Sequence, residues 1–297
     1  MNAALPGHTA SANVADVVEG AAGQRAHSET LLQVDNVSLE YRTCERVVRA
    51  THQVSFEVDR ADRFVLLGPS GCGKSTLLKA VAGFIKPSEG QIRLAGERIE
   101  EPGPDRIVVF QEFDQLPAWK TVIENVMFPL LASRTLKRAE ANERARYYLE
   151  KVGLSAFADA YPHTLSGGMK ARVAIARALA MQPKILLMDE PFAALDALTR
   201  RKMQEELLEL WQEVRFTLLF VTHSIEEALV VGNRILLLSP HPGRVRAEIN
   251  SHQFDLGSLG GVDFQASAQR IHRLLFDEGQ EPALELAVDF QRLRIAY

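Results

Sequence analysis

One glycine-rich loop constrains the fold of this chain more than any other segment. Residues 64–68, FVLLG, are an apolar run typical of a buried strand, and they lead directly into GPSGCGKST at 68–76. Leu77, Leu78 and Val81 follow at helical spacing. A strand, a glycine-rich loop and a helix in this order form a phosphate-binding unit. The sequence therefore predicts an α/β fold that binds a nucleotide at this loop.

The loop matches the pattern G-x-x-x-x-G-K-S. Its glycines let backbone N–H groups surround phosphate oxygens, and the N-terminus of the next helix adds partial positive charge. Lys74 is expected to reach the β and γ phosphates, and the Ser75 hydroxyl to bind Mg²⁺. The predicted nucleotide-binding residues of the loop are Gly68, Pro69, Ser70, Gly71, Cys72, Gly73, Lys74, Ser75 and Thr76.

A second apolar strand pattern, ILLMD at 185–189, ends in two carboxylates. Asp189 at its tip is expected to hold Mg²⁺, directly or through water, and Glu190 to polarise the attacking water. Two acids at a strand end could also be ordinary solvated polarity. The phosphate-binding loop upstream favours the catalytic interpretation.

The segment LSGGMK at 165–170 precedes an apolar helical pattern that continues to about residue 181. Ser166 can cap this helix, and Gly167 and Gly168 expose further N–H groups, so a second anion-binding helix N-terminus is expected. A simple N-cap is the alternative. Because only the loop at 68–76 has the Lys and Ser for a metal-bound nucleotide, the second terminus is expected to serve a nucleotide held by another copy. A dimer follows from this interpretation.

Composition narrows the class of protein. With 297 residues, 46% of them hydrophobic, the chain can fill a large core, and its net charge of −4 argues against nucleic acid as a partner. No apolar run is long enough for a membrane helix, and there is no signal-peptide pattern, so a cytosolic location is expected. Cys44 and Cys72 make no disulfide framework and no zinc-type cluster, which agrees with a reducing compartment.

Three regions are expected along the chain. Residues 1–29 lack any sustained period and are interpreted as a disordered tail. Residues 30–250 form the main domain, with short β patterns first, then buried parallel strands, and a helical subdomain at about 112–182 in which Gly153 is expected to end a helix. Residues 251–297 are interpreted as a helical extension, with helices at 264–276 and 281–295.

Six motifs in order make residues 31–245 resemble the ATP-binding subunit of an ABC transporter. The resemblance implies the P-loop NTPase cassette fold, with a mainly parallel core sheet, an N-terminal antiparallel β portion and a helical subdomain. It also implies that ATP and Mg²⁺ are bound and that ATP is hydrolysed. Its further site assignments are Tyr41 stacking on adenine, Gln111 sensing Mg²⁺ and the membrane partner, Ser166 to Gly168 on the opposite nucleotide, Glu190 as general base, Asp196 communicating across the dimer and His223 at the γ-phosphate.

The same resemblance implies partners and a location. These are a homodimer of ATP-binding subunits, integral membrane permease subunits and, indirectly, a solute-binding protein, at the cytoplasmic face of the inner (plasma) membrane. Docking of a permease helix is expected at Phe113, Leu116, Trp119 and Val122; alternatively these residues only pack the helical insert.

The stretches EEPGPDRIVVFQE, LSGGMK and LLSPHPGRV resemble the nitrate, taurine, sulfonate and bicarbonate import branch. Met169 stands where the commonest signature has Gln, and LPAW carries one extra residue. The expected function is an ATPase that powers import of a small anionic solute. An exporter subunit, a soluble ABC ATPase acting on DNA or the ribosome, and a regulatory module without turnover are the alternatives.

Overall fold

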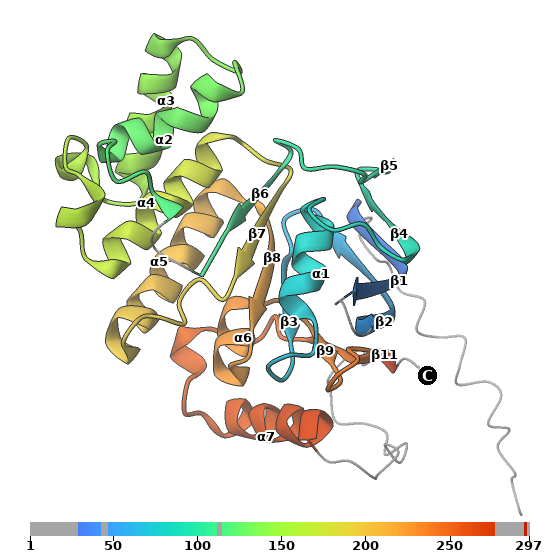
Figure 1. Cartoon of the computed structure of the whole chain (residues 1–297). Coiled ribbons are helices and arrows are strands. Elements are labelled where there is room, and N and C mark those ends of the chain that lie inside the picture. The colour runs from blue at the N-terminus through green and yellow to red at the C-terminus, as the bar shows by residue number, and fades with distance from the viewer. Residues whose placement is uncertain (1–28, 43–46, 112–114, 277–293, 296–297) are drawn as a thin grey trace, which may run out of the picture.

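The computed structural model describes residues 29–42, 47–111, 115–276 and 294–295. Two β-sheets and a group of helices make up this part of the chain (Figure 1). The smaller sheet has the order β2-β1-β4-β5, and the larger sheet the order β11-β10-β9-β3-β8-β7-β6. The expected 1–29 tail lies almost entirely outside the described residues.

The smaller sheet is antiparallel and is built from the N-terminal β patterns. Its strands are β1 (Thr30–Arg42), β2 (Val47–Asp59), β4 (Glu89–Leu94) and β5 (Glu97–Arg98). Alternating side chains of β2 are buried and exposed, as expected for a sheet with one face in the core.

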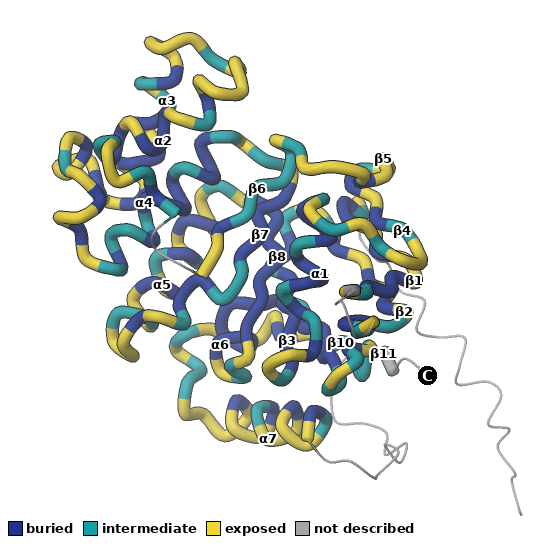
Figure 2. Tube along the Cα trace, viewed as in Figure 1, coloured by how far each residue is buried: buried dark blue, intermediate teal, exposed yellow. Residues whose placement is uncertain are grey.

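The larger sheet is parallel from β9 to β6, and only its β10 and β11 edge is antiparallel. Its strands are β3 (Arg63–Leu67), β6 (Arg106–Val109), β7 (Ile185–Asp189), β8 (Thr217–Thr222), β9 (Arg234–Leu238), β10 (Val245–Asn250) and β11 (Arg294–Ile295). Figure 2 shows the central strands of this sheet as the most buried part of the molecule. Burial on both faces explains why the sequence of these strands is continuously apolar.

Each face of the parallel sheet has its own core, because successive side chains of a strand point to opposite faces. Phe64 and Leu66 pack with the antiparallel sheet and helix α1 (Lys74–Val81), whereas Val65 and Leu67 pack with the remaining helices. Those helices are α2 (Val122–Ala132), α3 (Arg138–Lys151), α4 (Gly167–Ala180), α5 (Ala197–Val214), α6 (Ile225–Val231) and α7 (Val262–Phe276). Short 3₁₀ turns lie at Ser155–Phe157, Pro162–Thr164 and Leu256–Ser258.

Helices α2, α3 and α4 form a lobe to one side of the sheet, as the sequence predicts for the helical subdomain (Figure 1). Helix α3 ends at Lys151 and Gly153 has a φ of +66°, which fits the expected C-terminal glycine. The two sheets, their strand directions and the helical lobe confirm the predicted fold class.

The C-terminal prediction is partly wrong. The expected helix at 264–276 is present as α7, and its apolar face joins the core. The expected helix at 281–295 falls outside the described residues up to 293, and it is wrong at its end: Arg294–Ile295 form β11, which pairs with β10. At these two residues, hydrogen bonding to the edge strand β10 overrides the helical sequence pattern.

Candidate nucleotide-binding site

The glycine-rich loop, Asp189, Glu190 and His223 gather at one edge of the parallel sheet. Strands β3, β8 and β7 are parallel neighbours, so their carboxyl ends lie together. The loop at 68–73 follows β3, Asp189 ends β7, and His223 follows β8. Ligand sites of α/β sheets form outside the carboxyl ends of the strands, which is where these residues lie.

The glycine-rich loop is held in a conformation that its sequence permits. Gly71 and Gly73 have φ values of +81° and +96°, which non-glycine residues rarely adopt. A Cβ on Gly73 would lie 2.7 Å from the backbone oxygen of Ala50. Lys74 is buried, and its Nζ donates hydrogen bonds to the carbonyls of Gly68 (2.7 Å) and Pro69 (2.9 Å). The ammonium group therefore lies beside the loop backbone, where phosphate oxygens are expected.

Ser75 and Asp189 meet across the site. The Ser75 hydroxyl donates a 2.7 Å hydrogen bond to Oδ1 of Asp189, 114 residues further along the chain. Burial raises the pKa of Asp189 above its ordinary value, and the hydrogen bond from Ser75 acts against this shift. A hydroxyl and a carboxylate oxygen are ligand types that Mg²⁺ prefers, so the pair fits the predicted metal site.

Glu190 and His223 form the second pair. His223 Nδ1 lies 2.9 Å from Oε2 of Glu190, and the backbone N–H of Glu190 donates to Val221 O at 3.0 Å. Glu190 has a φ of +46°, an uncommon value for a glutamate. The backbone of β7 thus turns sharply after Asp189, which lets the two adjacent acids serve different partners.

Tyr41 lies beside the loop, as the adenine assignment requires. Its hydroxyl is 2.6 Å from Oγ1 of Thr76, and the residue is exposed. One end of the side chain is thus fixed at the first turn of α1 while part of it remains available for stacking. Gln111 follows β6 and is exposed; residues 112–114 beyond it are outside the described part of the chain.

Ser166 and Asp196 each cap a helix away from the loop. Oγ of Ser166 accepts the N–H of Met169 at 3.3 Å, which confirms the predicted N-cap of α4. Asp196 caps α5 by accepting from Leu198 N (3.1 Å) and Thr199 N (3.0 Å). A hydrogen bond from the Thr199 side chain, together with these backbone bonds, lowers the pKa of Asp196. A Cβ on Gly168 would lie 3.1 Å from Thr199 Cγ2, so the LSGG segment lies against the first turn of α5. Helices α4 and α1 lie well apart in Figure 1.

The expected docking surface is only partly present. Trp119 is 78% exposed, whereas Leu116 and Val122 are buried and pack the core. Their assignment to an exposed surface is wrong because both side chains fill the space under the helical lobe. Phe113 lies outside the described residues.

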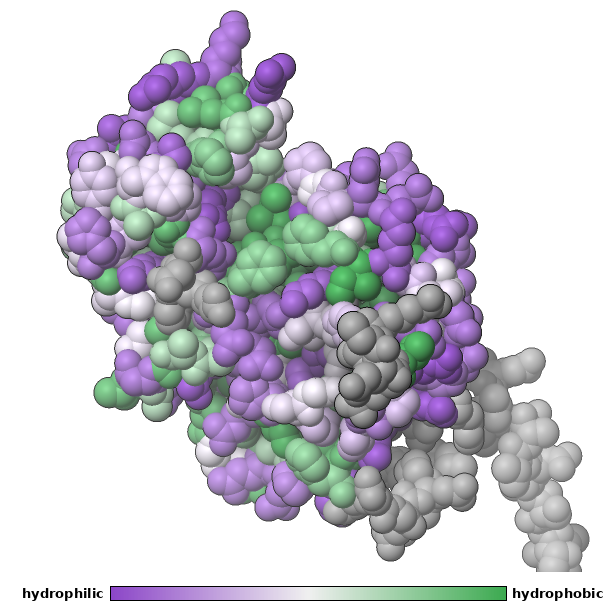
Figure 3. Space-filling view, viewed as in Figure 1, coloured by the Kyte–Doolittle hydropathy of each residue, from purple (hydrophilic) through white to green (hydrophobic). Residues whose placement is uncertain are grey.

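Sequence reasoning also missed a stacked pair of exposed aromatic residues. The rings of Phe84 and Phe110 stack with centroids 6.4 Å apart, and both are exposed. Figure 3 shows apolar side chains gathered between the helical lobe and the part of the core that carries α1. In the sequence, both residues follow apolar strand or helix patterns and look like core residues. Only the folded structure shows that their side chains are exposed.

A buried carboxyl group near His223 was also missed. Glu227 on α6 is 8% exposed and accepts hydrogen bonds from Thr222 and from Gln204 of α5. The signal was an acid inside the apolar run IEEALVV, where a buried helix face would place it.

The strand ends, the glycine-rich loop and the acid pair define a P-loop nucleotide hydrolase. The ABC transporter family model matches residues 51–193. The taurine import ATP-binding protein TauB of Rhizobium johnstonii is 51% identical over 74% of this chain and 84% of its own length. The nitrate import ATP-binding protein NrtD of Synechococcus elongatus is 43% identical over 75% of this chain and 82% of its own.

A solved structure, described as a dimeric post-hydrolysis state of the ATP-binding cassette MJ0796 bound to ADP and Pi, is similar in fold. Its TM-score is 0.65 at 33% identity, with 75% of this chain and 100% of that chain covered. The chain belongs to the ABC transporter family. The predicted resemblance is confirmed, as is the predicted class of activity, ATP hydrolysis coupled to transport.

Within the described ranges, no helix combines the length and apolar character needed to cross a membrane.

Proposed function

We propose that this chain is the ATP-hydrolysing subunit of an importer for a small anionic solute, and that Glu190 acts as its general base. The observation that carries the proposal is the set of side-chain pairs at one sheet edge. Ser75 with Asp189, and Glu190 with His223, come from three parallel strands and their loops. Such an arrangement suits in-line transfer of a phosphoryl group to water.

The residues around the loop divide the tasks of binding and hydrolysis among them. Backbone N–H groups of residues 68–76 and the N-terminus of α1 hold the β and γ phosphates, and Lys74 adds a positive charge there. Ser75 and Asp189 would hold Mg²⁺, which supplies charge neutralisation on the phosphates. Glu190 accepts a proton from the attacking water, and His223, paired to it, contacts the γ-phosphate. Tyr41 stacks on the base, and Gln111 completes the metal site from the end of β6.

The site is completed by a second copy of the chain. Ser166 to Gly168 present a helix N-terminus that lies apart from the loop of their own chain, and they fit the γ-phosphate of a nucleotide on a partner. Asp196 caps the N-terminus of α5 beside that segment and would communicate closure between the two copies. A solved relative described as a dimeric cassette supports this arrangement.

The remaining partners follow from the family. Permease subunits would hold the dimer at the cytoplasmic face of the membrane, with the exposed Trp119 among the docking residues. A solute-binding protein would choose the cargo. The relatives' names include taurine, nitrate, bicarbonate and aliphatic sulfonates, all small molecules with an anionic group, which supports the proposed cargo class.

The proposal is tested by Glu190→Gln and Lys74→Ala in the full-length chain. Glu190→Gln should keep ATP binding and lower the rate of hydrolysis by about 100-fold or more, because a general base contributes at least that factor. Lys74→Ala should weaken both binding and hydrolysis. Phosphate release and equilibrium ATP binding are the measurements. Near-normal hydrolysis by purified Glu190→Gln protein would contradict the assignment of the base.

A further inference from the structure

The buried hydroxyl group of Thr222 makes two hydrogen bonds within the turn that carries His223. Thr222 is 1% exposed; its Oγ1 accepts the backbone N–H of Ser224 at 3.0 Å and donates to Oε2 of Glu227. Oγ of Ser224 in turn accepts the N–H of Glu227 at 3.3 Å. These bonds close the segment 222–227 on itself and leave His223 and Glu226 as its exposed residues.

The other oxygen of the Glu227 carboxyl group leads to helix α5. Gln204 is 7% exposed and donates from Nε2 to Oε1 of Glu227 at 3.0 Å. Helices α5 and α6 are thus joined by a hydrogen bond between two buried polar side chains. A buried polar network of this kind fixes one arrangement of its elements, because each unpaired member would cost free energy.

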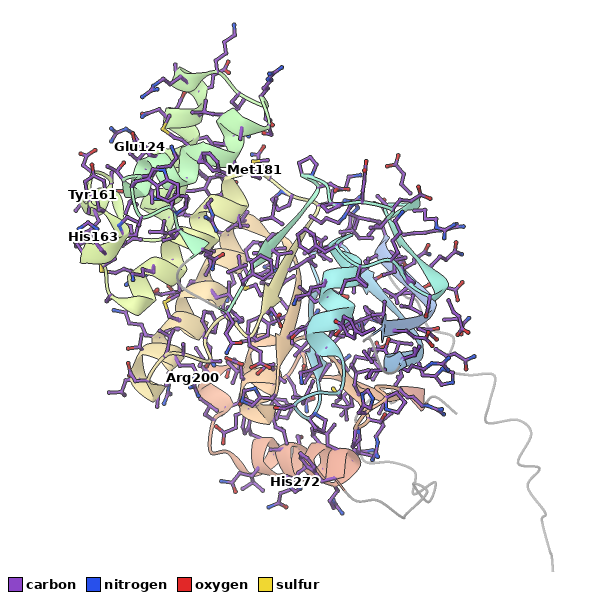
Figure 4. The ribbon with its side chains drawn as sticks, in the orientation of Figure 1. Glu124, Tyr161, His163, Met181, Arg200 and His272 are labelled. Carbon is purple, nitrogen blue, oxygen red and sulfur yellow. The ribbon has the colours of Figure 1, made fainter. Side chains whose placement is uncertain are left out.

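Helix α5 also holds the segment between Glu190 and Asp196. Arg200, labelled near the beginning of α5 in Figure 4, donates from Nε to Phe192 O (3.3 Å) and from Nη2 to Leu195 O (2.9 Å). Gln204 is one helical turn further on. The backbone that follows Glu190 and the turn that carries His223 are therefore both fixed to α5.

We propose that Glu227 is a positioning residue for ATP hydrolysis: its carboxyl group fixes the turn carrying His223 and ties that turn, through Gln204, to α5. Rotation of α5 on dimer closure would then move His223 together with Asp196. This inference rests on the proposed role of His223. Glu227 itself touches neither nucleotide nor water in this account and acts only through its neighbours.

The test compares Glu227→Ala and Thr222→Val with Glu226→Ala in the full-length chain. Glu226 is adjacent on the same helix but exposed, which makes it the matched control. Glu227→Ala and Thr222→Val should each lower kcat by about tenfold or more through displacement of His223, with ATP affinity within about twofold of the parent. Glu226→Ala should leave both quantities unchanged.

A double-mutant comparison separates positioning from general destabilisation. Each substitution is repeated in a His223→Ala background, where Glu227→Ala and Thr222→Val should lower kcat no further. Equal losses in both backgrounds, or Glu227→Ala behaving as Glu226→Ala, would overturn the proposal. If Glu227→Ala does not fold, Thr222→Val decides, since it keeps the shape of the side chain. Normal hydrolysis by His223→Ala alone would instead refute the role of His223, and with it this inference.

Discussion

At the scale of single residues, the site depends on loop positions where the backbone conformation favours glycine over any residue with a side chain. Gly71 and Gly73 share a positive φ, but they differ in their surroundings. A Cβ on Gly71 would meet nothing within 4 Å, whereas one on Gly73 would lie 2.7 Å from both Ala50 O and Thr51 Cγ2. Of these two glycines, only Gly73 therefore packs closely against β2.

Gly73→Ala should lower the free energy of unfolding by about 2–4 kcal/mol, because backbone strain and a backbone clash add. Gly71→Ala should cost about 1–2 kcal/mol, since only the strained φ is involved. Urea denaturation without nucleotide measures both, so that loss of phosphate contacts does not enter. A Gly73→Ala protein as stable as Gly71→Ala would contradict the described packing.

Most of the proposed site could be read from sequence because its motifs are local. The loop at 68–76 needs only neighbouring residues to form, and a strand that ends in Asp189 must place it at the sheet edge. Glu227 was not recognised because its partners, Thr222 and Gln204, come from different elements. Leu116 and Val122 were misjudged for the same reason: burial under the helical lobe is a tertiary property.

At the scale of elements, α4 presents its N-terminus through one capping side chain. Ser166 is expected to do two things: to accept the Met169 N–H in its own helix and to contact a phosphate on a partner chain. These tasks can be separated, because aspartate caps a helix as well as serine does but repels a phosphate.

Ser166→Asp should therefore keep the stability of the parent within about 0.5 kcal/mol, whereas Ser166→Ala should lose about 1 kcal/mol with the cap. Both should impair ATP hydrolysis, Ser166→Asp more severely. Thermal unfolding and phosphate release are measured side by side. An active Ser166→Asp protein would show that this helix end does not meet the nucleotide.

Helix α6 carries the buried acid, and its ionisation links stability to pH. Burial raises the pKa of Glu227 above its ordinary value, while hydrogen bonds from Thr222 and Gln204 and the charges of Arg200 and His223 act in the opposite sense. With the pKa higher in the folded state, the folded chain holds this proton more tightly. The contribution of the Glu227 proton to the free energy of unfolding is therefore complete below the pKa that Glu227 has in the unfolded chain. It is lost as pH rises through the pKa of Glu227 in the folded chain.

The Glu227→Gln variant lacks this loss, since an amide does not ionise. As pH rises from about 4.5, the stability of the parent relative to Glu227→Gln should therefore fall. Urea denaturation across a pH series measures the difference, with Glu226→Gln as the exposed control. A parent that gains stability relative to Glu227→Gln as pH rises would show that hydrogen bonds, not burial, dominate the carboxyl group.

At the scale of the whole molecule, α7 is part of the main core. Phe264, Ile271 and Leu275 are buried in the same cluster as the helices that cover the parallel sheet, and Phe254 packs edge-on against Phe264. Helix α7 runs beneath α6 in Figure 1. The sequence showed the amphipathic pattern of α7 but could not show that its apolar face packs against the core of the main domain.

Removing residues 252–297 should lower the free energy of unfolding by on the order of 5 kcal/mol, because several buried apolar side chains are lost and their contacts exposed. Removing only residues 277–297 keeps α7 and serves as the control. Denaturant unfolding compares the two truncations. Equal stability of both would mean that α7 packs weakly and acts as a separate extension.

The central claim is that two copies of this chain enclose ATP between the loop at 68–76 of one and the LSGG segment of the other. The most direct test is the mass of the Glu190→Gln protein in solution, measured by light scattering with ATP and Mg²⁺ and again with ADP. The account predicts a dimer with ATP, a monomer with ADP, and loss of the ATP dimer when Ser166→Asp is added. A Glu190→Gln protein that binds ATP and remains a monomer would contradict it.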